Sequence, residues 1–329
     1  MSPRFDENDQ EHYDRPRRRT RPRTKDRPKH ADAVLARVTT IDRGRYTLLY
    51  DEHVVTAMTA RQLGRKAVVV GDWVRVVGDV SGDTGALARI VSVESRSTTL
   101  RRTADDDDPV ERVIVSNAEQ LVVVTSLADP PPRPRLIDRC LVAAFDSGMA
   151  PVICLTKADL ADPDELVQAY APLDVPMLVT QRGGDLDVVR EALRDRMSVL
   201  VGHSGVGKST LVNGLVPDAK RLTSHVNVVT GRGRHTSTSA ILLPLPFGGA
   251  IVDTPGIRSF GLAHVTPDSI LASFTDLATV AAECPRGCMH AVDSPECALD
   301  VGVADGRLDR ARVDSMRRVL ASRERTTGD

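Results

Sequence analysis

A glycine-rich segment that ends in Lys-Ser-Thr is the strongest chemical signal in this sequence. It reads GHSGVGKST and matches the spacing G-x-x-x-x-G-K-[ST]. Glycines let the backbone curl so that its N–H groups point at phosphate oxygens, and a helix starting there adds the positive end of its dipole. We expect Lys208 to reach the β- and γ-phosphates of a nucleotide and the Ser209 hydroxyl to ligate Mg²⁺. His203 is expected to be an ordinary loop side chain. The residues of this phosphate loop are Gly202, His203, Ser204, Gly205, Val206, Gly207, Lys208, Ser209 and Thr210.

A second motif, Asp253-Thr254-Pro255-Gly256, follows the apolar run GAIV. A carboxylate at the end of a strand, downstream of a phosphate loop, is placed to hold Mg²⁺ through water, so we assign this role to Asp253. The Gly256 amide can donate to the γ-phosphate. The tetrapeptide alone could be a plain turn, but together with the phosphate loop it predicts a GTPase-like site.

A third motif, Thr156-Lys157-Ala158-Asp159, follows the apolar run APVICL. The Asp159 carboxylate can accept from guanine N1–H and the 2-amino group, a pair of donors that adenine lacks. The stem of Lys157 can lie over the base. Guanine-binding motifs ordinarily begin with Asn, and Thr156 offers fewer contacts to the base. An ordinary surface loop is the alternative for this motif in isolation. Residues 178–180 could form a second, small base-contacting loop.

The elements that must position these motifs alternate between strand and helix. Apolar runs predict strands at 120–126, 150–156, 176–180, 197–201 and 249–252, and amphipathic patterns predict helices at 135–148, 163–173 and 185–196. Such alternation indicates a parallel sheet with helices on both faces. Ligands of these sheets bind at the carboxyl ends of the strands, where all three motifs fall.

The order of the motifs is unusual. The base-reading motif ordinarily comes last, but here Thr156–Asp159 precedes the phosphate loop. The sequence therefore predicts a circularly permuted GTPase, in which the same site is built from a chain opened elsewhere.

The region before the α/β domain reads as a small β-barrel. Short β-rich runs at 33–42, 45–50, 53–59, 67–78 and 86–94 suit a barrel of the OB type, and an SH3-like barrel is the alternative. Trp73, the single tryptophan, is expected to pack in a core in preference to stacking on bases.

The C-terminal region carries the cluster Cys284-x₃-Cys288-x-His290-x₆-Cys297. Three thiolates and an imidazole can complete a tetrahedral Zn²⁺ shell with no vacant position for catalysis. The alternative is a set of reduced surface cysteines. The two other cysteines, Cys140 and Cys154, lie in an apolar helix and an apolar strand, and we expect ordinary buried thiols there.

Composition sets the remaining limits. The chain has 329 residues, of which 41% are hydrophobic and 27% charged, which suits two or three domains and not a membrane-spanning protein. No apolar run approaches the roughly 18 residues of a membrane span, and no secretory signal is visible, so a cytoplasmic location is expected. The net charge of −1 hides a basic, proline-rich run at 15–29, which we expect to be disordered. This tail could contact a polyanion or only add solubility.

A small barrel, a permuted GTPase domain and a C-terminal cysteine cluster together resemble the ribosome small-subunit-dependent GTPase A (RsgA) family. The resemblance covers roughly residues 34–320 and rests on the phosphate loop, Gly71–Val74, Gly233–Thr236 and the cysteine cluster. Compared with this chain, the family pattern has one more residue between the first two cysteines and one fewer between the histidine and the last cysteine. The resemblance implies a cytoplasmic GTPase of late 30S ribosomal subunit maturation that binds rRNA.

Hydrolysis requires a group that orients water, and Ile257 stands where Ras-like enzymes have Gln. Family members similar to this chain have a His at the position of His235. We take His235 as the candidate for this role, against the alternative of a solvated loop histidine, and expect Thr236 or Thr238, with Thr236 preferred, to close onto Mg²⁺.

These inferences define the expected organisation and function. We expect a disordered basic tail (1–32), an OB-like barrel (33–98), a circularly permuted α/β GTPase domain (99–262) and a helical zinc-binding module (263–329). The expected ligands are GTP or GDP, Mg²⁺ and one Zn²⁺. We expect a monomer that binds the 30S subunit and its rRNA and does not bind a membrane. Two other functions remain open. One is an RNA-docking placeholder that uses GTP only as a conformational clamp; the other is an ATPase or kinase, against which Asp159 argues.

Overall fold

The structure is a computed structural model that describes residues 30–51, 53–64, 67–103, 111–217, 240–254, 262 and 264–322. The basic run at 15–29, the candidate catalytic residues His235 and Thr236, and Gly256 and Ile257 lie outside the described residues. Among the helices that are described, none is both long and apolar enough to cross a membrane.

Five short strands close into the N-terminal barrel. They are β1 (Val34–Asp42), β2 (Arg45–Tyr50), β3 (His53–Thr59), β4 (Trp73–Gly78) and β5 (Ala88–Val93). Their order around the barrel is β1-β2-β3-β5-β4, with β3 and β5 parallel and the other pairs antiparallel. Alternate residues of each strand fill the interior, as the period of a β-strand requires, and the expectation of an OB-like barrel is confirmed.

The strand expected at 67–78 is wrong in its first half, because β4 begins only at Trp73. Gly71 has a φ of +91°, and a Cβ atom there would lie 2.2 Å from the carbonyl oxygen of Ser116. The carboxylate of Asp72 then accepts a hydrogen bond from the Val69 amide at 2.8 Å, which closes a tight turn. Trp73 does not pack in the core either: it is 37% exposed, and the Arg37 guanidinium lies 4.9 Å from its ring centroid.

A two-stranded hairpin that the sequence did not predict follows the barrel. It pairs β6 (Thr99–Thr103) with β7 (Glu111–Ser116). Asp72 is fully buried where this hairpin meets the barrel, and its carboxylate accepts from Arg96 at 2.7 and 2.8 Å and from the Ser116 hydroxyl at 2.6 Å. A buried carboxylate with this many donors is fully compensated, so it can hold barrel and hairpin together.

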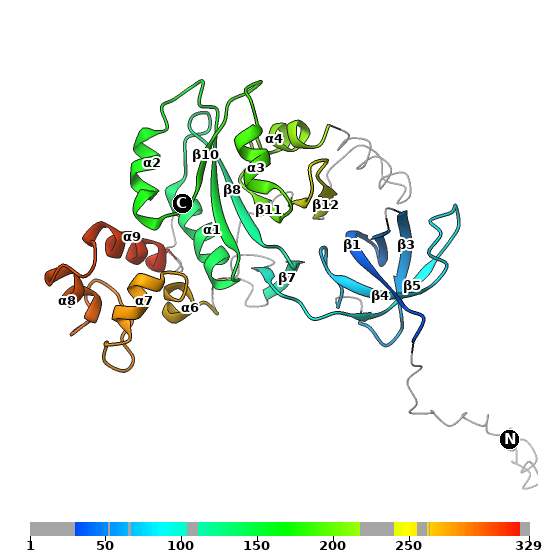
Figure 1. Cartoon of the computed structure of the whole chain (residues 1–329), viewed down its shortest axis with the longest axis horizontal. Coiled ribbons are helices and arrows are strands. Elements are labelled where there is room, and N and C mark those ends of the chain that lie inside the picture. The colour runs from blue at the N-terminus through cyan, green and yellow to red at the C-terminus, as the bar shows by residue number, and fades with distance from the viewer. Residues whose placement is uncertain are drawn as a thin grey trace, which may run out of the picture. The chain divides into compact units, whose positions relative to one another are not determined.

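The central domain is built on a six-stranded sheet of order β10-β9-β8-β11-β13-β12 (Figure 1). Its strands are β8 (Gln120–Ser126), β9 (Ala150–Thr156), β10 (Met177–Val179), β11 (Met197–Val201), β12 (Ile241–Pro244) and β13 (Ala250–Asp253). All neighbouring strands are parallel except β12, which pairs antiparallel with β13. The parallel strands agree with the sequence expectation, whereas the edge strand β12 was not predicted.

Helices cover both faces of this sheet, as a parallel sheet requires. They are α1 (Pro134–Asp146), α2 (Asp164–Tyr170), the 3₁₀ turn η2 (Ala171–Leu173), α3 (Asp187–Leu193) and α4 (Lys208–Leu215). In β8, Leu121 and Val123 belong to the core under α1, while Val122 and Val124 belong to the core under α3 and α4. This alternation explains why all seven residues of β8 are buried.

The C-terminal region contains the helices α6 (Pro267–Leu271), α7 (Thr275–Ala281), α8 (Ala298–Ala304) and α9 (Arg310–Ala321). Two arginines of α9 contact α7, η2 and α2. Arg312 forms a two-point ion pair with Asp276 and donates to the Pro172 carbonyl at 2.9 Å. Arg318 lies 4.8 Å from the ring centroid of Tyr170. These contacts connect α9 to the elements beside the sheet.

Candidate functional site

The phosphate loop connects the end of β11 to the start of α4. Gly202 follows the strand, and a Cβ atom there would lie 2.4 Å from the Val124 carbonyl oxygen, so only glycine fits. Gly207 caps α4 with a φ of +88°. The helix begins at Lys208, and Ser209 and Thr210 in its first turn are exposed. The loop therefore leaves the N–H groups of a helix terminus and two hydroxyls open to a ligand.

Lys208 and Asp253 form an ion pair that joins two of the predicted motifs. Asp253 ends β13, which runs parallel to β11 with Asp253 opposite Leu200. The buried Thr254 hydroxyl donates to the Leu200 carbonyl at 2.7 Å and ties this motif to the neighbouring strand. A cation suited to phosphate and a carboxylate suited to Mg²⁺ thus meet at one edge of the sheet.

Thr156 links the guanine motif to the phosphate loop. It ends β9 and is buried, and its hydroxyl donates to the Val206 carbonyl at 2.6 Å, with the Thr125 carbonyl at 3.3 Å. Val206 is also fully buried. The hydroxyl of Thr156 is therefore used inside the protein, where it supports the predicted phosphate loop.

The rest of the guanine motif lies in the turn after β9. Lys157 has a φ of +59°, and its ammonium donates to the Asp129 carbonyl. The Ala158 amide donates to the Thr180 carbonyl at 3.1 Å, which joins the loop after β10 to this turn. Asp159 is exposed, so its carboxylate is available to a ligand. These strand ends bring residues 156–159 and 178–180 together.

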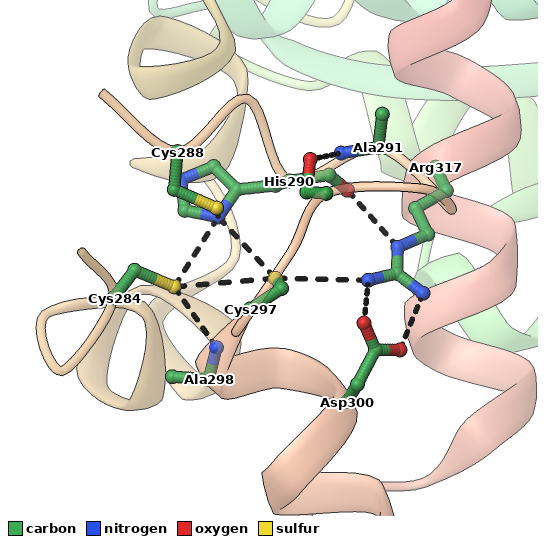
Figure 2. A network of polar contacts seen from close by, with 9 residues as sticks. Cys284, Cys288, His290, Ala291, Cys297, Ala298, Asp300 and Arg317 are labelled. Carbon is green, nitrogen blue, oxygen red and sulfur yellow. Dashed lines mark hydrogen bonds and ion pairs between the residues drawn. The ribbon is translucent and has the colours of Figure 1, made fainter. Parts of the chain in front are cut away.

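The four predicted metal ligands converge in the loop between α7 and α8 and at the start of α8 (Figure 2). Their ligand atoms all lie within 4.8 Å of one another. His290 Nδ1 lies 3.6 Å from Cys284 Sγ, 3.6 Å from Cys288 Sγ and 3.9 Å from Cys297 Sγ. Zinc bonds of about 2.3 Å to sulfur and 2.0–2.1 Å to nitrogen at tetrahedral angles put ligand atoms about 3.5–3.8 Å apart. The donor set and the separations of 3.6–3.9 Å between His290 Nδ1 and the three sulfurs therefore suit tetrahedral zinc.

The environment of His290 also suits a metal ligand. Burial lowers the pKa of His290 below its ordinary value, which favours the neutral imidazole that binds metals. The altered spacing of the cysteines does not separate the ligands, because all four atoms are within reach of one ion.

Cys140 and Cys154 differ from this cluster. Both are fully buried in apolar cores, on α1 and β9, and burial raises the pKa of each thiol to about 12. Thiols with such pKa values stay protonated and unreactive at neutral pH, as the sequence led us to expect.

Comparison with known proteins decides the family. The model of the RsgA GTPase family matches residues 93–263. The chain belongs to the RsgA GTPase family. A curated relative, the small ribosomal subunit biogenesis GTPase RsgA of Chlorobaculum parvum, is 37% identical over 278 residues, which cover 82% of this chain and 89% of that protein. The protein of the same name from Shewanella oneidensis is 35% identical over 283 residues, covering 83% and 78% of the two chains.

Solved structures give the same fold. YjeQ from Thermotoga maritima aligns with a TM-score of 0.63 at 26% identity, covering 88% of this chain and 98% of that chain. YloQ, described as a circularly permuted GTPase, aligns with a TM-score of 0.62 at 25% identity over 90% and 96% of the two chains. These comparisons confirm the predicted family, the multidomain fold and the activity of a GTP hydrolase. Membership of a GTPase family implies GTP or GDP as the nucleotide and Mg²⁺ as its metal ion.

The structure also shows contacts between the predicted motifs that the sequence did not reveal. The loop after β8 contacts both Lys157, in the turn after β9, and the predicted phosphate loop. Pro130 Cδ lies 3.5 Å from where a Cβ of Gly205 would be, and the Pro130 carbonyl accepts from Ser126 Oγ at 2.6 Å. The signal that could have predicted these contacts is the central position of β8 in the sheet, which places the loop after it near both motifs.

Proposed function

We propose that this RsgA GTPase binds the small (30S) ribosomal subunit and assists its late maturation, with GTP hydrolysis stimulated by the subunit and coupled to release. The observation that carries the proposal is the convergence of Thr156–Asp159, the phosphate loop and Asp253 at one edge of the sheet, in permuted order. Curated relatives that span most of the chain are named small ribosomal subunit biogenesis GTPases, which supports the same role.

We assign the nucleotide-binding roles as follows. The backbone of the phosphate loop and Lys208 bind the β- and γ-phosphates, while Ser209 and, through water, Asp253 hold Mg²⁺. A Mg²⁺ ion held by Ser209 and Asp253 would supply positive charge to offset the charge that develops on the phosphates. Asp159 accepts two hydrogen bonds from guanine, and Lys157 covers the base. The ion pair of Lys208 with Asp253 and the exposure of Asp159 support these assignments.

The water-orienting role is proposed for His235, and closure onto Mg²⁺ for Thr236. Gly256 is proposed to donate its amide to the γ-phosphate. These three roles rest on the sequence, since the residues lie outside the described part of the chain. An imidazole with a pKa near neutrality is suited to orient water or accept its proton.

The Cys₃His cluster is proposed to hold one structural Zn²⁺ through Cys284, Cys288, His290 and Cys297. The ion would cross-link the loop before α8 and leave no open position for a substrate. We further propose that the protein acts as a cytoplasmic monomer and contacts rRNA within the subunit. We also propose domain boundaries at 32, 98 and 262.

The decisive test is GTP turnover measured with purified 30S subunits, with 50S subunits and with neither. We expect stimulation by 30S subunits alone, and loss of the stimulated turnover in Lys208→Ala. Equal turnover in all three samples, with 30S binding retained, would instead favour the placeholder that uses GTP as a clamp. Competition by ATP as strong as by GTP would contradict the guanine-reading role of Asp159.

A further inference from the structure

Arg317 of α9 lies beside the cysteine cluster and contacts two of its ligand residues (Figure 2). Its Nε donates to the His290 carbonyl at 2.9 Å, and its Nη2 lies 3.7 Å from Cys297 Sγ. The same guanidinium makes a two-point ion pair with Asp300 at 2.8 and 2.9 Å. Only 7% of the Arg317 side chain is exposed. Four contacts thus orient one buried cation beside the cluster.

These contacts hold the backbone that presents the ligands. His290 has a φ of +57°, a conformation that costs a non-glycine residue energy unless its surroundings hold it. The bond from Arg317 to the His290 carbonyl provides such a restraint. Cys297 is the N-cap residue of α8, and Asp300 lies in the first turn of that helix. Arg317 therefore fixes the His290 loop and the start of α8 relative to α9.

The charge of Arg317 suits a thiolate–metal centre. Zinc with three thiolates and a neutral imidazole carries a net charge of −1, and burying that charge is costly unless a cation lies close by. Arg317 is that cation for Cys297. Asp300 accepts from Nη1 and from the same Nη2 that faces Cys297, and it is 47% exposed, so water screens the carboxylate more than the buried cation. Nη2 carries two protons and therefore donates to both the sulfur and Asp300.

We propose that Arg317 is a positioning residue of the metal centre: it holds His290 and Cys297 in ligating geometry and offsets the charge of the bound thiolates. Metal retention then depends on Arg317 more strongly than folding of the module does. This inference rests on the proposed zinc site. Partners of metal ligands typically contribute about 10- to 100-fold to metal affinity, which sets the expected magnitude.

The test uses the full-length, zinc-loaded protein and competition with a chromophoric chelator. Arg317→Met removes the charge and the hydrogen bonds, and we expect its zinc affinity to fall about 10- to 100-fold. Arg317→Lys keeps the charge but loses the forked geometry, so an intermediate loss is expected. Arg312→Met is the matched control, because Arg312 lies on the same helix and makes a similar two-point ion pair, with Asp276, away from the ligands. Its zinc affinity should stay within about twofold of wild type.

A second measurement separates metal binding from folding. If Arg317 acts through the metal, the difference in Tm between wild type and Arg317→Met is larger in zinc-loaded protein than in zinc-free protein, because zinc stabilises the state that binds it and stabilises the weaker-binding variant less. An equal difference in Tm with and without zinc, or unchanged zinc affinity in Arg317→Met, would overturn the inference. If Arg317→Met does not fold, Arg317→Lys replaces it: weaker zinc binding supports the inference, and wild-type binding overturns it. Wild-type protein without stoichiometric zinc would refute the metal site itself.

Discussion

The contact between Thr156 and the phosphate loop allows a quantitative test of how the site is built. Thr156→Val keeps the shape of the side chain and removes the hydroxyl that donates to the Val206 carbonyl at 2.6 Å. Both residues are buried, so the carbonyl loses its partner without gaining bulk water. Leaving a buried acceptor unpaired costs about 1–3 kcal/mol.

This cost can fall on either of two measurable quantities. If the loop relaxes in the absence of ligand, GDP binding must restore the conformation with the unpaired carbonyl, and the cost is paid on binding. A cost of about 1.4 kcal/mol would weaken GDP binding tenfold. If the loop does not relax, the folded state carries it, and the Tm falls by about 2–4 °C for each kcal/mol. We expect the two effects together to amount to about 1–3 kcal/mol.

The assay is calorimetric titration with GDP, combined with thermal unfolding of the same samples. Thr156→Ser, which keeps the hydroxyl, is the control and should bind GDP nearly as wild type does. Thr156→Val with GDP affinity within about twofold of wild type and an unchanged Tm would refute the reasoning. The hydroxyl would then contribute nothing to the loop.

Two further predictions concern the base and the hydrolytic step. Asp159→Asn places an amide donor against the donors of guanine, so GTP affinity should fall at least about a hundredfold while affinity for xanthosine nucleotides rises. If Asp159→Asn bound GTP as tightly as wild type in competition binding, the assigned role would be contradicted. His235→Ala should lower kcat about a hundredfold with GTP affinity retained, as measured by single-turnover hydrolysis beside equilibrium binding. An unchanged kcat would remove His235 from the mechanism.

Sequence patterns predicted the elements with strong local signals. The run Gln120–Ser126 is uniformly apolar and β-rich, and it is the buried strand β8. Residues 135–148 show amphipathic spacing, and α1 spans Pro134–Asp146. The phosphate loop was evident because its glycines and Lys-Ser-Thr occupy a fixed spacing between a strand and a helix. In each case the determinants lie within a few consecutive residues.

The elements that were missed depend on partners far along the chain. The run at 67–71 is as apolar as a strand, but Gly71 turns against Ser116, and the strand starts late. Strand β12 exists through its antiparallel pairing with β13. Trp73 looked like a core residue by type, yet its exposed ring stacks with Arg37 from a neighbouring strand. Local composition carries no information about such partners.

The sequence by itself determined the residues on which the proposed chemistry rests: the candidate phosphate loop, the candidate guanine-reading motif upstream of it, the carboxylate proposed for Mg²⁺ and the Cys₃His set proposed for zinc. Only the tertiary structure decided that the Thr156 hydroxyl supports the phosphate loop at Val206 and that Arg317 contacts Cys297. The reason is physical. Motif spacing encodes backbone geometry over a few residues, whereas a hydrogen bond between distant residues depends on how separate strands and helices pack.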